Sequence, residues 1–142
     1  MVERCRGAQY PRLIGKMLSG WAIMGERQVL PGYCLLLPDP VVPHLNALPP
    51  TLRAQFMADM ARIGDALLAV TGGLRINYAI FGNVEPALHA HVFPRSSAEP
   101  ESQRVAQPWA LDWNAAPEYS EALHGDIKQR IGLELRKQRA IE

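Results

Sequence analysis

The sequence predicts an α+β fold: an antiparallel sheet of about four to five strands, with a main helix after the second strand and a C-terminal helix. Three observations support this class. Short apolar runs are separated by turn residues at hairpin spacing, one central segment has helical periodicity, and so does the last segment. The 142 residues, 48% hydrophobic and 20% charged, are typical of one domain. We expect a single domain over 1–142, with its core at 20–95 and a C-terminal loop and helix at 96–142.

The first part of the chain predicts two strands joined by a turn. Residues 12–18 favour a short helical turn before them. We expect the strands at Trp21–Gly25 and Tyr33–Leu37, because both runs are apolar and a Pro-Gly pair marks a turn between them. The prolines that follow the second run lack the N–H donors of a strand, so they predict a rigid loop.

Thr51–Val70 is the clearest helix in the sequence. A pair of prolines precedes it and a pair of glycines follows it, as is typical of the start and end of a helix. Apolar residues recur along it at three- and four-residue steps, which predicts one face turned toward a core. These residues are Leu52, Phe56, Met60, Ile63 and Leu67.

The rest of the sheet is predicted from two further runs. The segment "LRINYAIFGN" (74–83) predicts a third strand whose final Gly-Asn pair begins a short turn, and Leu88–Phe93 predicts a returning fourth strand. Residues 96–117 are polar and contain prolines, so we expect an ordered loop there. A second amphipathic helix is expected from Tyr119 to about Gln138, because one row at four-residue steps is apolar. That row is Leu123, Ile127, Ile131 and Leu135.

Charge and cysteine usage narrow the class of function. A formal net charge of +1 produces no overall field toward nucleic acid or an anionic membrane. Cys5 and Cys34 are isolated in the sequence, so we expect free thiols in a reducing compartment. No apolar run is long enough for a signal peptide or a membrane span. We therefore expect a cytoplasmic protein with neither nucleic-acid nor membrane partners.

The stretch "ALHAHVFPR" (87–95) contains the strongest functional signal. Because successive strand side chains point to opposite faces, His89 and His91 share one face and the residues between and around them share the other. Burying the apolar side would leave two imidazoles side by side in a groove. His44 and His124 stand alone in a proline loop and on a helix, and we interpret both as surface or packing residues.

Two kinds of chemistry fit such a histidine pair. The pair could ligate a metal, although a closed zinc site needs further ligands, and none lies nearby at a recognisable spacing; Cys34 or His44 could approach only through the fold. Alternatively, one neutral imidazole could attack phosphorus to form a covalent intermediate. Its neighbour would then hold a phosphoryl oxygen or manage the leaving-group proton.

The segment "GNVEPALHAHVFPR" resembles the active-site strand of the histidine triad family, whose signature is His-x-His-x-His followed by two apolar residues and often Pro-Arg. "PGYCLLLP", "LNALPPTLRAQFMADMARIGDAL" and "RINYAIFGN" are similar to the elements that precede this strand in the family. The resemblance extends over about residues 20–95.

This sequence departs from the family pattern at several positions. The first triad position is Ala87, the glycine-rich phosphate loop is shortened to "GNVEP", and Tyr33 replaces a family histidine. A branch that resembles diadenosine polyphosphate hydrolases also has a short Gly-Asn turn, lacks the first histidine and carries a later tryptophan-containing segment. Here "QPWALDW" (107–113) is similar to that segment.

The resemblance implies a catalytic role for both histidines. His89 would attack the α-phosphorus of a nucleoside polyphosphate or related conjugate, and water would hydrolyse the nucleotidyl-histidine. A backbone carbonyl would have to hold the other nitrogen of His89 protonated, so that a lone pair faces phosphorus. His91 would contact the phosphate or the leaving group.

The resemblance also suggests residues that bind the nucleotide, each with a structural alternative. Asn83 would lie on the phosphate side or simply form the turn. Arg95 would neutralise an outer phosphate or cap a solvated strand end. Trp109 and Trp113 would stack on a base or seal a dimer, or would instead anchor the core or the loop. Asn77 would face the ribose.

We expect no resident cofactor or metal, with Mg²⁺ as a counter-ion of the substrate, and a homodimer by family resemblance. Two alternatives stay open. The chain could be a non-catalytic nucleotide-binding protein that lost competence with Ala87 and Tyr33, or a metal-binding module.

Overall fold

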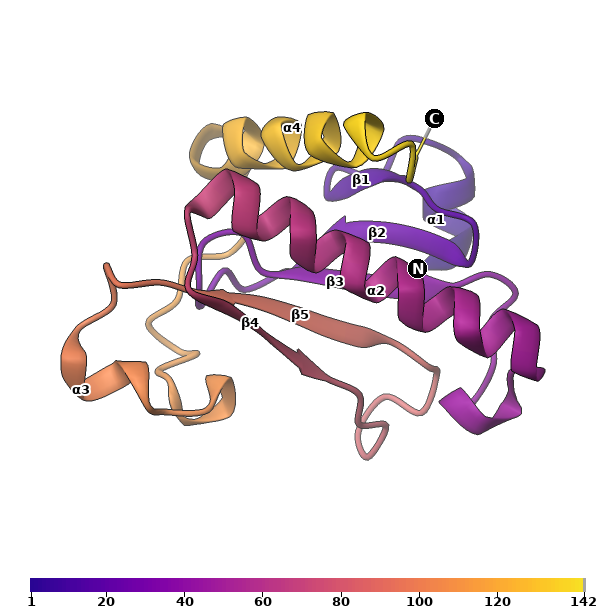
Figure 1. The fold of residues 1–142 in the computed structure, drawn as a ribbon, viewed down its shortest axis with the longest axis horizontal. Helices are drawn as coiled ribbons and strands as arrows, with labels where there is room; N and C mark the ends of the chain where they lie inside the picture. Colours follow the sequence, from indigo (N-terminus) through magenta and orange to yellow (C-terminus); the bar gives the residue numbers. More distant parts are fainter. Residues whose placement is uncertain (142) are drawn as a thin grey trace.

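A five-stranded antiparallel sheet organises residues 1–141, the part of the chain that the computed structural model describes (Figure 1). The strand order is β1-β2-β3-β5-β4, which places β3 and β5, from different halves of the chain, side by side at the centre. This architecture confirms the predicted α+β class and antiparallel sheet. The strands are β1 (Leu13–Lys16), β2 (Gly20–Met24), β3 (Cys34–Pro38), β4 (Arg75–Ala79) and β5 (Ala90–Arg95).

The predicted helical turn at 12–18 is wrong, because Leu13–Lys16 forms the edge strand β1. Leu13 lies opposite Ile23 and Lys16 opposite Trp21 in an antiparallel pair with β2. A tight turn permits this pairing, since the N–H of Met17 donates to the carbonyl oxygen of Gly20 at 2.7 Å. The segment is too short to reveal a period of its own, so pairing with β2 determines its structure.

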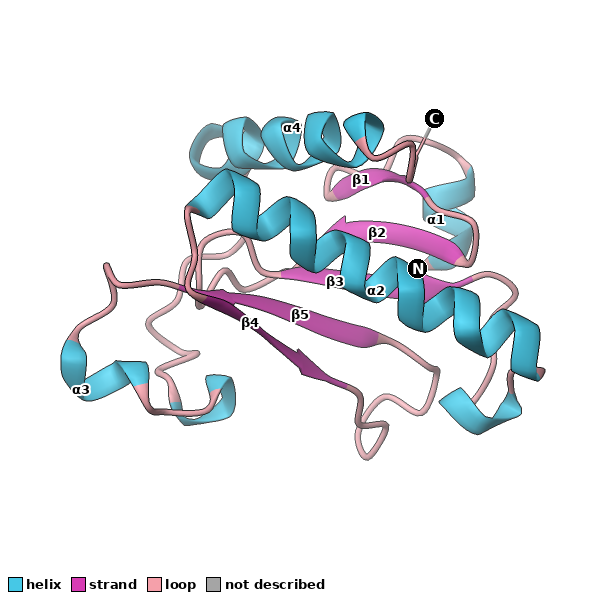
Figure 2. Cartoon of the chain, viewed as in Figure 1, coloured by secondary structure: helices cyan, strands magenta, loops and turns pink. Residues whose placement is uncertain are grey.

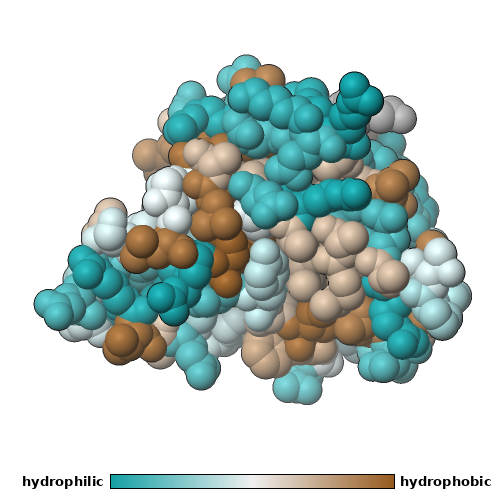
Figure 3. Space-filling view, in the orientation of Figure 1, coloured by the Kyte–Doolittle hydropathy of each residue, from teal (hydrophilic) through white to brown (hydrophobic). Residues whose placement is uncertain are grey.

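Two helices cover one face of the sheet (Figure 2). Helix α2 (Pro50–Thr71) contacts β3, β4 and β5, whereas α4 (Glu121–Lys137) contacts α2 and β1. Helix α2 ends at Gly72, whose φ of 63° is the left-handed conformation that glycine adopts at low cost. The outer side of α4 is mostly hydrophilic in the space-filling view (Figure 3). None of the helices in residues 1–141 is long and apolar enough to cross a membrane.

The predicted apolar rows are buried except at their first positions. In α2, Phe56, Ile63 and Leu67 are fully buried, whereas Leu52 in the first turn is exposed. In α4, Ile131 and Leu135 are fully buried and Ile127 is half-buried, but Leu123 is 69% exposed. Both exceptions lie in the first turn of their helix. The rows therefore identify the buried face correctly but do not show how far along each helix burial extends.

The opposite face of the sheet carries the N-terminal helix and the segment after β5. Helix α1 (Val2–Arg6) packs Val2 and Cys5 against Ile23 and Leu37. The expected ordered loop at 96–117 contains two short helices, α3 (Glu101–Arg104) and the 3-10 helix η2 (Pro108–Ala110), and lies beside one end of the β4–β5 pair (Figure 1). A third short helix, η1 (Leu45–Ala47), interrupts the proline loop before α2.

Strand β5 separates the core from the face that carries α1. Ala90 and Val92 are fully buried against the helices, together with Leu88 just before the strand, as the alternation predicted. The strand begins at Ala90 rather than Leu88, so His89 immediately precedes it and His91 lies within it. The register pairs His91 with Leu35 on β3 and with Ala79 on β4, so two neighbouring strands flank this imidazole.

Candidate functional site

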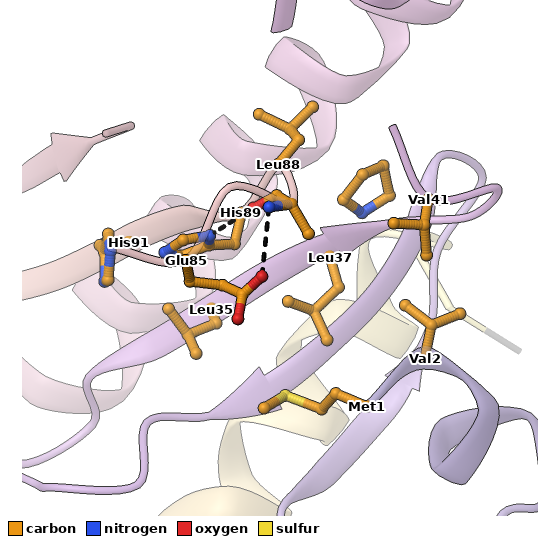
Figure 4. Close-up of a pocket in the computed structure, with 11 residues that line it drawn as sticks. Met1, Val2, Leu35, Leu37, Val41, Glu85, Leu88, His89 and His91 are labelled. Carbon is orange, nitrogen blue, oxygen red and sulfur yellow. Dashed lines mark hydrogen bonds between the residues drawn. The ribbon is translucent and has the colours of Figure 1, made fainter. Parts of the chain in front are cut away.

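The two imidazoles of the histidine pair lie against each other. The ring centroids of His89 and His91 are 4.8 Å apart, with the ring planes inclined at 73°. Both side chains are half-buried. Figure 4 shows both rings at the end of the cavity where β5 begins. The sequence-predicted proximity of the two rings is therefore present.

The main chain orients His89. Its Nδ1 atom lies 2.7 Å from the carbonyl oxygen of Ala87 (Figure 4). Because a carbonyl oxygen only accepts hydrogen bonds, Nδ1 must carry the proton, and the lone pair of the neutral ring lies on Nε2. Within residues 1–141, Nε2 has no hydrogen-bond partner and is not a buried unsatisfied atom, so it reaches open space. This is the tautomer that a nitrogen nucleophile requires.

A tyrosine orients His91. The Oη atom of Tyr33 lies 2.6 Å from Nδ1 of His91. Burial raises the pKa of the Tyr33 phenol far above its usual range, so the hydroxyl keeps its proton. Burial, and to a smaller extent the neighbouring His89, lowers the pKa of His91 to about 4, so this imidazole is neutral at pH 7.

Two cavities meet at the histidine pair. The first, of about 440 Å³, is mostly apolar, and Figure 4 shows Leu35, Leu37 and Val41 along it, with Met1 and Val2 from the α1 end. We call it the apolar cavity. The second, of about 480 Å³, is the turn cavity, because it lies against the turn after β4. Besides the histidine pair and Glu85, which line both cavities, the turn cavity is lined by Phe81, Gly82, Asn83, Val84 and Trp109.

Glu85 is the only residue with a charged side chain among those that line the two cavities in the described chain. One of its carboxylate oxygens, Oε1, accepts a hydrogen bond from the N–H of Ala87 at 3.2 Å (Figure 4). That contact and the carbonyl contact to His89 both involve the main chain of residue 87. The short turn before β5 is thus held through two successive peptide groups, by the N–H and by the carbonyl oxygen of residue 87.

Two of the four predicted nucleotide-binding residues lie beside the histidine pair. Asn83 is exposed at the turn, directly after Gly82, whose φ of 130° favours glycine. Trp109 approaches His91 edge-on with ring centroids 4.9 Å apart and meets Phe81 at the same distance. Trp109 is 46% exposed, so its ring can contact a ligand in the turn cavity.

The other two predicted residues, Arg95 and Asn77, lie elsewhere, in the network that holds the segment after β5. The side chain of Arg95 is buried, not at a solvated strand end, and all its N–H groups are used within the protein. Its guanidinium donates to the Glu99 carboxylate, to Oδ1 of Asn77 and to the carbonyl oxygens of Gln103 and Ala106. The predicted phosphate contact of Arg95 does not fit this arrangement, because none of its donors is left for a phosphate. Asn77 gives its Oδ1 to Arg95, and its contact with a ribose stays a prediction.

The lone histidines have the structural roles expected of them. His44 is exposed, whereas His124 is buried and its Nδ1 accepts a hydrogen bond from the N–H of Ser120 at the start of α4. Neither Cys34 nor His44 approaches the histidine pair to complete a metal site. Among residues 1–141, no three His, Cys, Asp or Glu side chains gather as metal ligands.

Sequence reasoning missed two features of the site. It noted Tyr33 as a departure from the family but did not predict its hydrogen bond to His91. The signal was available: once β3 is placed beside β5, Tyr33, Leu35 and His91 lie on one face. The apolar wall supplied by Met1 and Val2 had no signal, because α1 packs there only through the tertiary fold.

A five-stranded antiparallel sheet, with a His-x-His sequence at the start of its inner strand β5, is the arrangement of a histidine triad protein. The chain belongs to the HIT domain family, whose model matches residues 12–98. This family includes hydrolases and transferases, members that bind nucleotides, and members without catalytic activity. No curated protein matches the sequence.

Solved structures share the fold along nearly the whole chain. A histidine triad protein from Sinorhizobium meliloti has 23% identity and a TM-score of 0.74, with 95% of this chain and 96% of that chain covered. One from Marinobacter aquaeolei has 18% identity and a TM-score of 0.75, with 95% and 94% covered. A hypothetical histidine triad nucleotide-binding protein from Sulfolobus tokodaii has 12% identity and a TM-score of 0.75, with 97% and 92% covered.

Proposed function

We propose that this chain is a nucleotide hydrolase or nucleotidyl transferase that acts on a nucleoside polyphosphate or related conjugate through a nucleotidyl-histidine intermediate. Nε2 of His89 attacks the α-phosphorus, and the bond from phosphorus to the leaving oxygen breaks with its electron pair on that oxygen. Water or another acceptor then attacks the same phosphorus and releases His89. The Ala87 carbonyl contact is the observation that carries the proposal, because it keeps the Nε2 lone pair available.

The charge of the site bears on the substrate. Glu85 is the only charged side chain among the described residues that line the apolar cavity and the turn cavity, so no side chain there offers a polyphosphate a cation. We therefore propose Mg²⁺ as a counter-ion of the substrate's phosphates rather than as a resident cofactor. The resemblance to the diadenosine polyphosphate hydrolase branch adds support from the short Gly-Asn turn, Ala87 and the segment with Trp109.

A non-catalytic nucleotide-binding protein is the second candidate. It is favoured by Ala87 and Tyr33, which leave two of the family's histidine positions without an imidazole. The apolar cavity and the exposed ring of Trp109 would serve such a binder equally well. The two candidates differ only in whether a bond to His89 forms.

We also propose that the protein works as a cytoplasmic homodimer. Tyr78 on the edge strand β4 and Phe81 just after it are both exposed, which suits an interface. Cys5 and Cys34 are buried free thiols, as expected for a reducing compartment. Light scattering across micromolar concentrations checks the dimer, and a monomer throughout would contradict it.

Trapping the intermediate separates the enzyme from the binder. The protein is incubated with a dinucleoside polyphosphate labelled at the α-phosphorus, with and without Mg²⁺, and quenched in denaturant. We expect label bound to wild-type protein that is released by acid and stable to base, and none bound to His89→Ala. Nucleotide binding by wild-type protein without any label transfer would reject catalysis and favour the binder.

A further inference from the structure

The residues packed around the ring of Tyr33 fix the position of its phenol. Its ring is buried and stacks on Phe93 with centroids 4.3 Å apart, while Trp113 meets it edge-on at 5.8 Å. On another side lies Gly25, where an added Cβ would stand only 2.2 Å from the Tyr33 ring. The absence of a side chain at residue 25 therefore makes room for this ring. The packing holds Oη against Nδ1 of His91 at 2.6 Å.

The direction of that hydrogen bond follows from the two groups. The buried phenol stays protonated, and the neutral imidazole has one nitrogen that can accept. Because Oη of Tyr33 has no other hydrogen-bond partner among residues 1–141, its O–H is directed at Nδ1 of His91, which accepts. The proton of the imidazole must then lie on Nε2, which has no partner within residues 1–141 and, like Nε2 of His89, is not a buried unsatisfied atom.

We infer that Tyr33 is a positioning residue that fixes His91 in the neutral Nε2–H tautomer, so that His91 serves as a hydrogen-bond donor to a phosphoryl oxygen and not as a proton carrier. This inference rests on the proposed function for its catalytic meaning. The tautomer itself follows from the contacts of Tyr33 alone. The two histidines consequently have opposite tautomers: His89 carries its proton on Nδ1, and His91 carries it on Nε2.

The groups around His91 reinforce this assignment. In the described chain, the titratable side chains that face it are His89 beside it, Tyr33 before β3 and Glu85 in the turn after β4. Trp109 and Phe93 complete its surroundings with apolar rings. No side chain among these accepts a hydrogen bond from His91 in the described structure, so no contact holds a second proton on its ring.

This tautomer has a chemical consequence for the leaving group. A neutral imidazole N–H is too weak an acid to protonate a departing atom, although it stabilises charge on a phosphoryl oxygen. The bond to the leaving group therefore breaks with both electrons on the departing atom and without a proton from His91. Groups that are stable as anions, such as a nucleoside phosphate, can leave under these conditions.

The tautomer is measured directly by ¹⁵N NMR of the imidazole nitrogens in protein labelled at histidine. For wild-type protein at pH 7, we expect His91 to have an unprotonated Nδ1 and a protonated Nε2. In Tyr33→Phe, we expect the Nδ1–H tautomer to become populated. Tyr119→Phe is the matched control, since it also removes one phenol hydrogen bond, that to Glu121 at 2.6 Å, and should leave the His91 signals unchanged.

The wild-type spectrum decides the matter even if a variant fails to fold. A protonated Nδ1 on His91, or an imidazolium at pH 6, would overturn the inference. So would His91 signals that are the same in folded Tyr33→Phe and in wild type.

An activity measurement tests the catalytic meaning separately. We expect Tyr33→Phe to lower kcat about 10- to 100-fold, the range for loss of a partner that orients a functional histidine. KM should change little, because the orientation of His91 that is lost in this variant matters mainly in the transition state. Unchanged kcat with the expected tautomer shift would reject the role of Tyr33 in catalysis. Absence of turnover in wild type would contradict the proposed function and leave the NMR test standing.

Discussion

The imidazole of His89 is oriented by Ala87, the residue whose side chain departs from the family pattern. Nδ1 of His89 and the carbonyl oxygen of Ala87 are 2.7 Å apart, two residues along one chain. Alanine at the first triad position lacks the family's imidazole but keeps the main-chain carbonyl oxygen that accepts the hydrogen bond from His89. Loss of the first histidine is therefore compatible with a correctly oriented nucleophile.

The first prediction separates the two histidines. We expect His89→Ala to abolish turnover while nucleotide affinity changes little, because a nucleophile acts in the transition state more than in binding. His91→Ala should retain weak activity. Steady-state rates and equilibrium binding of the same nucleotide check both variants. If His91→Ala is inactive and His89→Ala keeps most of the rate, the nucleophile is His91.

The second prediction concerns the leaving group. Ala87 leaves only His91 on this strand to manage a proton, and burial keeps that imidazole neutral while Tyr33 occupies its Nδ1. Help from a general acid is worth about 10²- to 10⁴-fold for a group that must be protonated as it departs. We expect a strong preference for dinucleoside polyphosphates over phosphoramidates of alkyl amines. Specificity constants on a matched adenylate pair decide it, and equal values would mean that a water or a protein group supplies the acid.

The third prediction concerns the network around Arg95. Arg95→Met would leave the Glu99 carboxylate buried and unpaired, at a cost of about 3–5 kcal/mol in the free energy of unfolding. Urea denaturation measures the loss. The double variant Arg95→Met/Glu99→Met should lose less, because neither charge is then buried. Lys137→Met, which breaks the exposed pair with Glu134, should cost less than about 1 kcal/mol. A loss as small for Arg95→Met would show that the network is not needed for stability.

The fourth prediction is a pH dependence of stability. The pKa of His91 is lowered to about 4 in the folded protein from an ordinary value of 6.5. As pH falls from 6.5 toward 4, the unfolded chain takes up a proton that the folded protein does not, so the free energy of unfolding decreases. Above pH 6.5, His91 contributes nothing to the pH dependence of the free energy of unfolding, because its ring is neutral in both states. Allowing for the partial exposure of the ring, we expect a slope of at most about 1 kcal/mol per pH unit.

A matched variant isolates this slope. His91→Gln removes the titrating group and should flatten the profile between pH 6.5 and 5, where carboxylates with lowered pKa values, such as Asp39 and Glu99, remain ionised. Urea denaturation at several pH values provides the comparison. Parallel profiles for the two proteins would show that the pKa of His91 is not lowered on folding.

The sequence predicts features that depend on local periodicity. The face shared by His89 and His91 follows from strand alternation, and the buried face of α2 follows from helical spacing. Pro50 and Gly72 mark the ends of that helix by their own backbone preferences. These elements needed no tertiary information.

Features that depend on contacts distant in sequence could not be predicted. β1 is a strand because β2 pairs with it, and Tyr33 reaches His91 because β3 and β5, 58 residues apart at this contact, are neighbours in the sheet. Arg95 shows the same limit in another form. The family resemblance suggested that Arg95 binds a phosphate, but the chain turns back after β5 and places Glu99 against it.

Arg95 anchors residues 96–113 to the sheet, so the exposed residues of this segment at the turn cavity, Trp109 among them, can be exchanged. Its buried guanidinium holds Glu99, Gln103 and Ala106, whereas Trp109 lies beyond these anchors and contacts His91 from outside the sheet. The exposed positions 107, 109, 110 and 112 can therefore be varied in a combinatorial library, with Pro108 and Leu111, which pack inward, and the anchoring network kept unchanged. Selection from such a library would redirect the protein toward new ligands without redesigning its scaffold.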